Sequence, residues 1–208
     1  MKVTYLILAI ALLLTGCDTG SNTAKNSTNG EVKKAVAPVA DGEVAVIEME
    51  TPAYGTIRLE LYSNIAPKMV ERFKTLAREG YYDGIVFHRI NTSVIQAGDS
   101  NTKPGATPAT ASREGNSGKP NVPAEFSDLQ YEAGTLGAAR LGNDINSANS
   151  QFFITLKREA SFDTKYTIFG KVIEGMNNVM TISGVQPKEG ERPIDPVRIK
   201  TIRIEPKQ

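Results

Sequence analysis

Two side chains that can act as nucleophile, metal ligand or proton carrier occur once each in this chain of 208 residues, namely Cys17 and His88. A single cysteine excludes an intramolecular disulfide, and a single histidine excludes a histidine-rich metal cluster. We therefore expect no metal and no other cofactor. His88 is followed directly by Arg89, whose guanidinium is always charged and presents several donors in a fixed fork. Chemistry at this pair would rest on fixed hydrogen-bond donors.

Cys17 follows an apolar run over residues 5–14 and a positively charged start at Lys2. This order is typical of a signal peptide, and the run is too short to cross a bilayer. The motif Leu14-Thr15-Gly16-Cys17 resembles the lipobox of bacterial lipoproteins. The resemblance implies that residues 1–16 are a signal peptide and that the Cys17 thiol is lipidated. The alternative is a buried, inert cysteine.

A lipidated Cys17 would anchor the protein to a bacterial membrane in the cell envelope, facing the periplasm or the exterior. Each buried methylene of the anchor adds about 0.8 kcal/mol, so attachment by more than one chain is stable. Asp18 resembles an inner-membrane retention signal of some Gram-negative bacteria, which leaves the choice between inner and outer membrane open.

The rest of the composition describes one ordinary domain behind this anchor. The chain has 24 Lys and Arg against 23 Asp and Glu, so no basic excess points to nucleic acid as a partner. Residues 17–42 are polar and small after the cysteine, with no strand or helix period, which predicts a flexible linker. Residues 43–206 are left for a single domain, which we expect to be a monomer.

The hydrophobic period within this domain indicates strands and two helices. Ile57, Leu59 and Leu61 alternate with polar residues, which predicts a strand with one buried face. Pro67 opens a helix that Gly80 ends, and a second helix over residues 176–182 ends near Gly184. Short strands are predicted at residues 44–49, 56–62, 135–140, 151–156, 166–172 and 197–204. Many short strands with two helices favour a closed antiparallel barrel with capped ends.

Five motifs in one order resemble the signature of the cyclophilin family of peptidyl-prolyl isomerases. They are Phe87-His88-Arg89-Ile90, Ile95-Gln96-Ala97-Gly98-Asp99, Gly134-Thr135-Leu136, Ser150-Gln151-Phe152-Phe153-Ile154 and Ile168-Phe169-Gly170-Lys171-Val172. The likeness covers residues 43–206, and Ala139-Arg140 is similar to the bacterial, often periplasmic, branch. The family resemblance implies a mostly β fold, a closed eight-stranded antiparallel barrel capped by two α-helices.

The same resemblance implies the site. Arg89 matches the arginine that stabilises the twisted proline amide, and Phe153 matches the phenylalanine under the proline ring. His88 is either a hydrogen-bonding rim of the pocket or a structural residue beside Arg89, and no proton transfer is needed. The residues implied to bind substrate are His88, Val94, Gln96, Ala139, Arg140, Gln151, Phe153, Phe162 and Tyr166.

The implied activity is isomerisation of X-Pro bonds in exported or envelope proteins, which assists their folding. The alternatives are a module or holdase that binds proline-containing segments with weak or no catalysis, and a purely structural lipoprotein.

Two departures from the family pattern concern the pocket. The segment 90–95 is one residue shorter than usual, so Ser93 or Val94 stands where the family has an aromatic residue. Ser161 stands where many eukaryotic members carry tryptophan, so we expect poor cyclosporin binding. Residues 103–119 read as a mobile surface loop beside the substrate groove.

Overall fold

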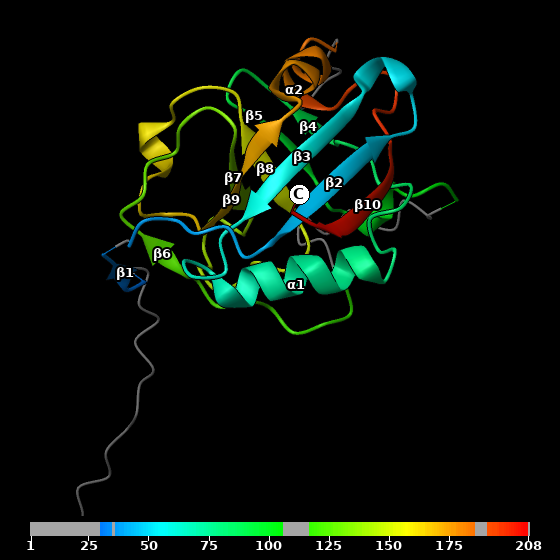
Figure 1. Ribbon diagram of the computed structural model, residues 1–208. Helices are drawn as coiled ribbons and strands as arrows, with labels where there is room; N and C mark the ends of the chain where they lie inside the picture. The colour runs from blue at the N-terminus through cyan, green and yellow to red at the C-terminus, as the bar shows by residue number, and fades with distance from the viewer. Residues whose placement is uncertain (1–29, 35, 106–116, 186–190, 208) are drawn as a thin grey trace, which may run out of the picture.

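Alternating apolar and polar residues fold this chain mainly into short strands. The computed structural model describes residues 30–34, 36–105, 117–185 and 191–207 (Figure 1). The elements within them are β1 (Val32–Lys33), β2 (Glu43–Met49), β3 (Thr56–Leu61), α1 (Pro67–Arg78), β4 (Arg89–Ile90), β5 (Val94–Ala97), β6 (Phe126–Ser127), β7 (Thr135–Ala138), β8 (Phe152–Thr155), β9 (Ile168–Glu174), α2 (Met176–Ser183) and β10 (Ile199–Pro206).

Eight of these strands form one antiparallel sheet in the order β10-β2-β3-β9-β7-β8-β5-β4. The sheet curls into an open half-barrel, so the prediction of a closed barrel was wrong (Figure 1). Among the described residues, no ladder joins the edge strands β4 and β10. An isolated bridge between Val86 and Arg198 and a few backbone hydrogen bonds, such as Phe87 N to Val197 O at 2.9 Å, lie between these edges. Periodicity predicts strands, but it does not specify whether the two edges pair.

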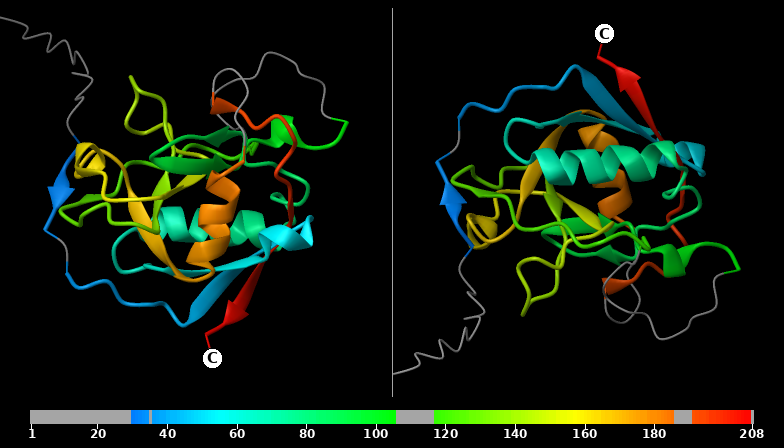
Figure 2. Two further views of the ribbon diagram at one scale, coloured as in Figure 1. Left: turned by 90° about the horizontal axis from the view of Figure 1, so that it is seen from above. Right: turned by 90° about the horizontal axis from the view of Figure 1, so that it is seen from below.

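The two predicted helices are confirmed and cover opposite ends of the curled sheet (Figure 2). α1 begins at Pro67, which needs no intrahelical donor there, and its chain turns at Gly80, where φ is +67°. Its apolar face enters the main core, where the rings of four phenylalanines and of Tyr82 have no exposed surface. The four phenylalanines are Phe73, Phe87, Phe152 and Phe169. These four were predicted to be core residues.

Part of the segment predicted to be a flexible linker packs along the domain. β1 pairs in parallel with β6, with Val32 opposite Phe126. Val39 N donates to Asn64 Oδ1 at 3.1 Å, and Asn64 Nδ2 donates back to Ala37 O at 3.0 Å. Within the described part of residues 17–42, backbone hydrogen bonds and the Asp41 side chain hold the chain, which composition does not predict.

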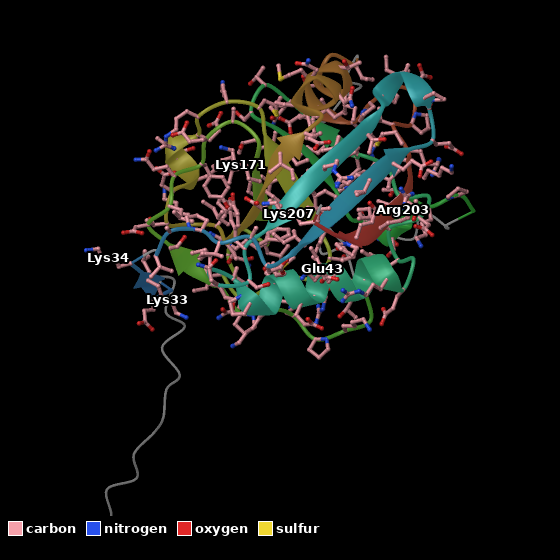
Figure 3. The ribbon with its side chains drawn as sticks, in the orientation of Figure 1. Lys33, Lys34, Glu43, Lys171, Arg203 and Lys207 are labelled. Atoms are coloured by element: carbon pink, nitrogen blue, oxygen red, sulfur yellow. The ribbon has the colours of Figure 1, made fainter. Side chains whose placement is uncertain are left out.

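A buried charge cluster fastens the end of this segment to α1. Lys74 donates to Asp41 and also forms a 2.8 Å ion pair with Glu43, which lies at the start of β2 beside α1 (Figure 3). The side chains of Lys74 and Asp41 are 9% and 10% exposed. The cluster fixes where residue 43 enters the sheet.

Cys17 and the predicted signal peptide lie outside the described residues, as does most of the predicted loop at 103–119. No helix in the described ranges combines the length and the apolar character that a membrane span requires.

Candidate active site

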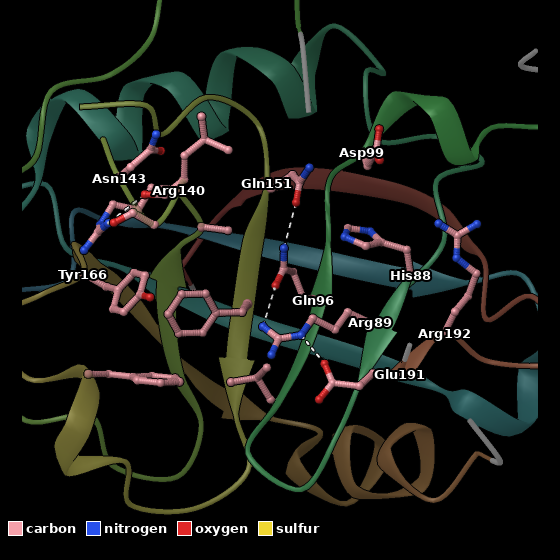
Figure 4. Close-up of a pocket in the computed structure, with 16 residues that line it drawn as sticks. His88, Arg89, Gln96, Asp99, Arg140, Asn143, Gln151, Tyr166, Glu191 and Arg192 are labelled. Atoms are coloured by element: carbon pink, nitrogen blue, oxygen red, sulfur yellow. Dashed lines mark hydrogen bonds and ion pairs between the residues drawn. The ribbon is translucent and has the colours of Figure 1, made fainter. Parts of the chain in front are cut away.

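The ten residues predicted to form the site all line one pocket of about 920 Å³ on the outer face of the half-barrel (Figure 4). Strands β4, β5 and β8 supply its base, and the loops around residues 139–143 and 160–166 supply its far wall. The lining residues are His88, Arg89, Val94, Gln96, Asp99, Ala139, Arg140, Leu141, Gly142, Asn143, Gln151, Phe153, Phe162, Tyr166, Glu191 and Arg192.

Strand register brings the central residues side by side. Arg89 pairs with Gln96 across β4 and β5, Gln96 pairs with Phe153 across β5 and β8, and Phe153 pairs with Gly137 across β8 and β7. Residues that oppose one another across a ladder point to the same face of the sheet. Because successive residues of a strand point to opposite faces, Phe153 lies at the pocket while Phe152 lies in the main core.

Aromatic rings form the apolar half of the pocket. The ring centroids of Phe162 and Tyr166 lie 5.6 and 5.7 Å from that of Phe153, both nearly perpendicular to it. Val94, which is 2% exposed, completes this wall with an aliphatic side chain and is one of the two residues, with Ser93, that the family resemblance places at the aromatic position. The result is a shallow apolar floor with aromatic sides, suited to a small ring.

Tyr131 supports this floor from beneath and was not predicted. Its ring stacks on Phe153 with 5.7 Å between centroids and 25° between planes. Gly137 allows this approach, because a Cβ at that position would lie 2.3 Å from Phe153 Cζ and 2.7 Å from Tyr131 Oη. Tyr131 stands in a short polar stretch that carries no local signal for burial.

A chain of polar side chains forms the other half of the pocket (Figure 4). Gln96 Nε2 donates to Gln151 Oε1 at 2.7 Å, and Arg89 Nη1 donates to Gln96 Oε1 at 3.4 Å. Arg89 Nε donates to Glu191 Oε2 at 2.5 Å. The hydrogen bond from Arg89 lowers the pKa of Glu191, so this carboxylate is ionised at neutral pH.

Arg140 closes the far side by contacts that a shorter side chain would not reach. Its guanidinium carbon lies 4.7 Å from the centroid of Tyr166, and its Nη1 and Nη2 donate to the carbonyls of Leu141 and Lys165. Ala139 N donates to Gln151 O at 3.0 Å. These contacts fix the backbone of residues 139 and 140 along the rim.

His88 lines the pocket and is partly buried. Burial lowers the pKa of His88, the nearby carboxylate of Asp99 opposes this, and Arg192 adds to it. Its Nδ1 is buried without a hydrogen-bond partner among the described residues. The imidazole is therefore neutral at pH 7.

Six lining residues were missed by sequence reasoning: Asp99, Leu141, Gly142, Asn143, Glu191 and Arg192. Glu191 is 102 residues from Arg89 along the chain, so no local spacing links the two. Within the described ranges, no group of three His, Cys, Asp or Glu side chains is placed to hold a metal ion.

The fold is thus an antiparallel half-barrel with two α-helices, and its pocket has a polar side that carries Arg89 and an aromatic side that carries Phe153. Residues 46–204 match the family model "Cyclophilin type peptidyl-prolyl cis-trans isomerase/CLD". The chain belongs to the cyclophilin family, whose named relatives are peptidyl-prolyl cis-trans isomerases.

Among these relatives is peptidyl-prolyl cis-trans isomerase ppi1 of Schizosaccharomyces pombe, 40% identical over 160 residues that cover 75% of this chain and 96% of that protein. A probable peptidyl-prolyl cis-trans isomerase of Brucella suis is 39% identical over 155 residues, covering 73% and 78%. The fold is similar to the crystal structure of a cyclophilin-type isomerase from Cryptosporidium parvum, with TM-score 0.68, 28% identity and coverage of 79% and 99%. Peptidyl-prolyl cis-trans isomerase activity follows from this membership.

Proposed function

We propose that this pocket binds an X-Pro segment of an unfolded chain with the proline ring against Phe153 and with Arg89 directed at the prolyl nitrogen. The observation that carries the proposal is the register that sets Arg89, Gln96 and Phe153 next to one another across three strands. The solved structure of the Cryptosporidium parvum relative was obtained in the presence of the dipeptide Ala-Pro, which supports a proline-containing ligand.

The chemistry of the bond explains why an arginine serves here. Rotation about an X-Pro bond has a barrier of about 18–20 kcal/mol because it breaks amide resonance. At the twisted transition state the prolyl nitrogen regains its lone pair and becomes a hydrogen-bond acceptor, which it is not in either planar isomer. A donor fixed at that nitrogen therefore binds the transition state more strongly than the ground state, which is the condition for catalysis.

One hydrogen bond from Arg89 does not supply the whole rate acceleration. An acceleration of ~10⁵ requires about 7 kcal/mol, and a charge-assisted hydrogen bond contributes about 1.5–3 kcal/mol. We assign the remainder to the aromatic wall of Phe153, Phe162 and Tyr166, which holds the ring and excludes water while the peptide turns about it.

The backbone of the substrate has polar partners on both sides of the ring. Gln96 and Gln151 offer amide groups near Arg89, and the main chain of Ala139 and Arg140 offers a carbonyl and an N–H at the opposite rim. No proton is transferred in this reaction, so His88 serves as a neutral part of the pocket rim.

Proline-bond exchange in a short Ala-Pro peptide, followed by NMR with and without the protein, tests this proposal. We expect exchange that depends on protein concentration and is lost in Arg89→Ala. Binding of the peptide without faster exchange would favour the second candidate, a binding module or holdase. The aliphatic Val94 in place of an aromatic wall is the observation that favours this second candidate.

We also propose that the protein is a lipoprotein of the bacterial cell envelope, anchored at Cys17 and facing the periplasm or the exterior, and that its substrates are exported proteins. The apolar run at residues 5–14 and the cysteine that follows it support this. Cys17→Ser, compared with the parent chain by fractionation of the source membranes, tests it. A variant that stays membrane-bound after loss of its signal peptide would contradict the anchor, and the fraction that holds the parent decides between inner and outer membrane.

A further inference from the structure

The carboxylate of Glu191 fixes one edge of the Arg89 guanidinium and leaves another edge free. Nε donates to Glu191 and Nη1 donates to Gln96, whereas no described residue accepts a hydrogen bond from Nη2. Figure 4 shows the guanidinium directed across the pocket toward Tyr166, with Glu191 on its other side. Two contacts on different nitrogens determine the plane of the group, and one contact would let it rotate.

A residue of the β4–β5 hairpin, which also carries Arg89, binds Glu191 in turn. Asn91 Nδ2 donates to Glu191 Oε1 at 3.0 Å, while Asn91 Oδ1 accepts from the backbone N–H groups of Ser93 and Val94, both at 2.8 Å. Because the tight turn between β4 and β5 occupies the oxygen of Asn91, its NH₂ group must face outward to Glu191. The two oxygens of this carboxylate thus join the turn to the guanidinium.

The backbone of Glu191 also indicates a specific placement. Its φ is +68°, in the left-handed region that disfavours a residue with a side chain. Strained positions of this kind persist where the surroundings require them, and they gather at functional sites. A glycine would adopt this conformation without strain, so the side chain is what the site gains from a glutamate here.

We propose that Glu191 is a positioning residue for isomerisation, which orients Arg89 so that its free Nη edge meets the prolyl nitrogen. This inference rests on the proposed role of Arg89. It adds that the orientation of Arg89 depends on the carboxylate of Glu191, which lies 102 residues away along the chain. The negative charge of Glu191 also weakens the electric field of the Arg89 guanidinium. If Arg89 acted only through electrostatic attraction, removing this carboxylate would therefore raise the rate of exchange. Orientation and attraction therefore predict opposite signs for the same substitution.

The test compares Glu191→Gln and Glu191→Gly with the parent in bound-state exchange of an Ala-Pro peptide, with peptide affinity measured by titration. Glutamine keeps the size and removes the charge, and glycine removes the carboxylate while relieving the backbone. We expect Glu191→Gly to slow exchange about three- to tenfold with affinity changed by less than about twofold. Glu191→Gln should fall between that variant and the parent. Glu174→Gln is the matched control, since Glu174 pairs with Arg58 at 3.5 Å outside the pocket.

Two further measurements separate positioning from a structural effect. The NMR signal of the Arg89 Nε–H group should shift in both Glu191 variants, because its acceptor is lost or neutralised. In an Arg89→Lys background, Glu191→Gly should change exchange by less than about 1.5-fold, because the residue acts through the guanidinium.

Exchange in Glu191→Gly that equals or exceeds the parent's rate, while Arg89→Lys is slow, would overturn this inference and leave the proposed function intact. Exchange in Arg89→Lys at the parent's rate would overturn the role of Arg89 itself. An equal loss from Glu191→Gly in both backgrounds would also overturn the inference, since the glutamate would then act on the fold and not on Arg89.

Discussion

The ring of Tyr131 lies flat beneath the ring of Phe153, so the floor of the pocket is two aromatic layers thick. Phe153 is 4% exposed and Tyr131 is fully buried. Both belong to a hydrophobic cluster on the outer face of the sheet that is separate from the main core. The pocket floor is therefore supported by this second cluster and not by the main core. Substitutions of Tyr131 and Phe153 test how the shape of the pocket affects the stability of the fold.

The hydroxyl of Tyr131 has no hydrogen-bond partner among the described residues, whereas that of the equally buried Tyr82 donates to Ser150 O at 3.1 Å. A buried polar group without a partner costs free energy, and a satisfied one contributes about 0.5–1.5 kcal/mol. We expect Tyr131→Phe to leave the free energy of unfolding unchanged or to raise it by about 1 kcal/mol. Tyr82→Phe should lower it by about 1 kcal/mol. Urea unfolding measures the free energy of unfolding of both variants. A larger loss of this free energy in Tyr131→Phe than in Tyr82→Phe would contradict the prediction.

Phe153→Ala should weaken peptide binding as well as exchange. Losing the ring removes about 1.5–3 kcal/mol of apolar contact, which corresponds to about tenfold or more in affinity. The same change opens a cavity above Tyr131 and should cost about 3–5 kcal/mol of stability. Phe153→Leu is the second variant, because it keeps much of the volume and should fold. Titration with an Ala-Pro peptide measures affinity, and full affinity in a folded Phe153→Leu variant would show that the ring is not the floor.

Ten of the sixteen residues that line the pocket could be identified from the sequence, through the resemblance of short motifs to the cyclophilin family. Gln151 and Phe153 stand two residues apart, and strand alternation already separates Phe152 from them. Arg89 and Gln96 are joined by one hairpin, so their pairing depends on few residues.

Glu191 and Tyr131 could not be found in the same way. The contact of Glu191 with Arg89 depends on how the chain returns after α2, and the burial of Tyr131 depends on the absence of a Cβ at Gly137. The open edge between β4 and β10 is a similar case, because it is decided by the path of residues 84–87 rather than by a hydrophobic period. Long-range geometry of this kind leaves no local pattern in a sequence.

The loss of stability as the pH falls into the acid range should depend on Asp41. Burial would raise the pKa of Asp41, but hydrogen bonds from Lys74 and Ser63 outweigh it and hold the pKa below its usual value. A carboxyl whose pKa is lower in the folded state stabilises the fold above its unfolded pKa of about 3.9 and loses this contribution as the pH falls through the folded value. We expect Asp41→Asn to cost about 1–3 kcal/mol at pH 7, because Lys74 keeps Glu43 as a partner.

The pH dependence distinguishes this role from a packing defect. The difference in unfolding free energy between the parent and Asp41→Asn should shrink as the pH falls below about 4, since the parent loses its own contribution there. Thermal unfolding from pH 3 to pH 7 follows the difference. Glu174→Gln, which removes an exposed ion pair with Arg58, serves as the control and should change stability little. A difference that stays constant with pH would contradict the assignment.

Arg89→Lys tests the geometry of the site with the charge retained. The guanidinium uses Nε for Glu191 and Nη1 for Gln96, and the proposed role in isomerisation assigns Nη2 to the substrate. An ammonium on a flexible stem does not reproduce these three directions. We expect catalytic efficiency to fall at least about tenfold, which corresponds to a loss of about 1.4 kcal/mol of transition-state stabilisation, while peptide affinity changes less. Arg58→Lys, which changes an arginine on β3 outside the pocket, is the matched control. Equal efficiency of Arg89→Lys and the parent would show that positive charge alone is sufficient, and the hydrogen-bond geometry assigned to Arg89 would then be wrong.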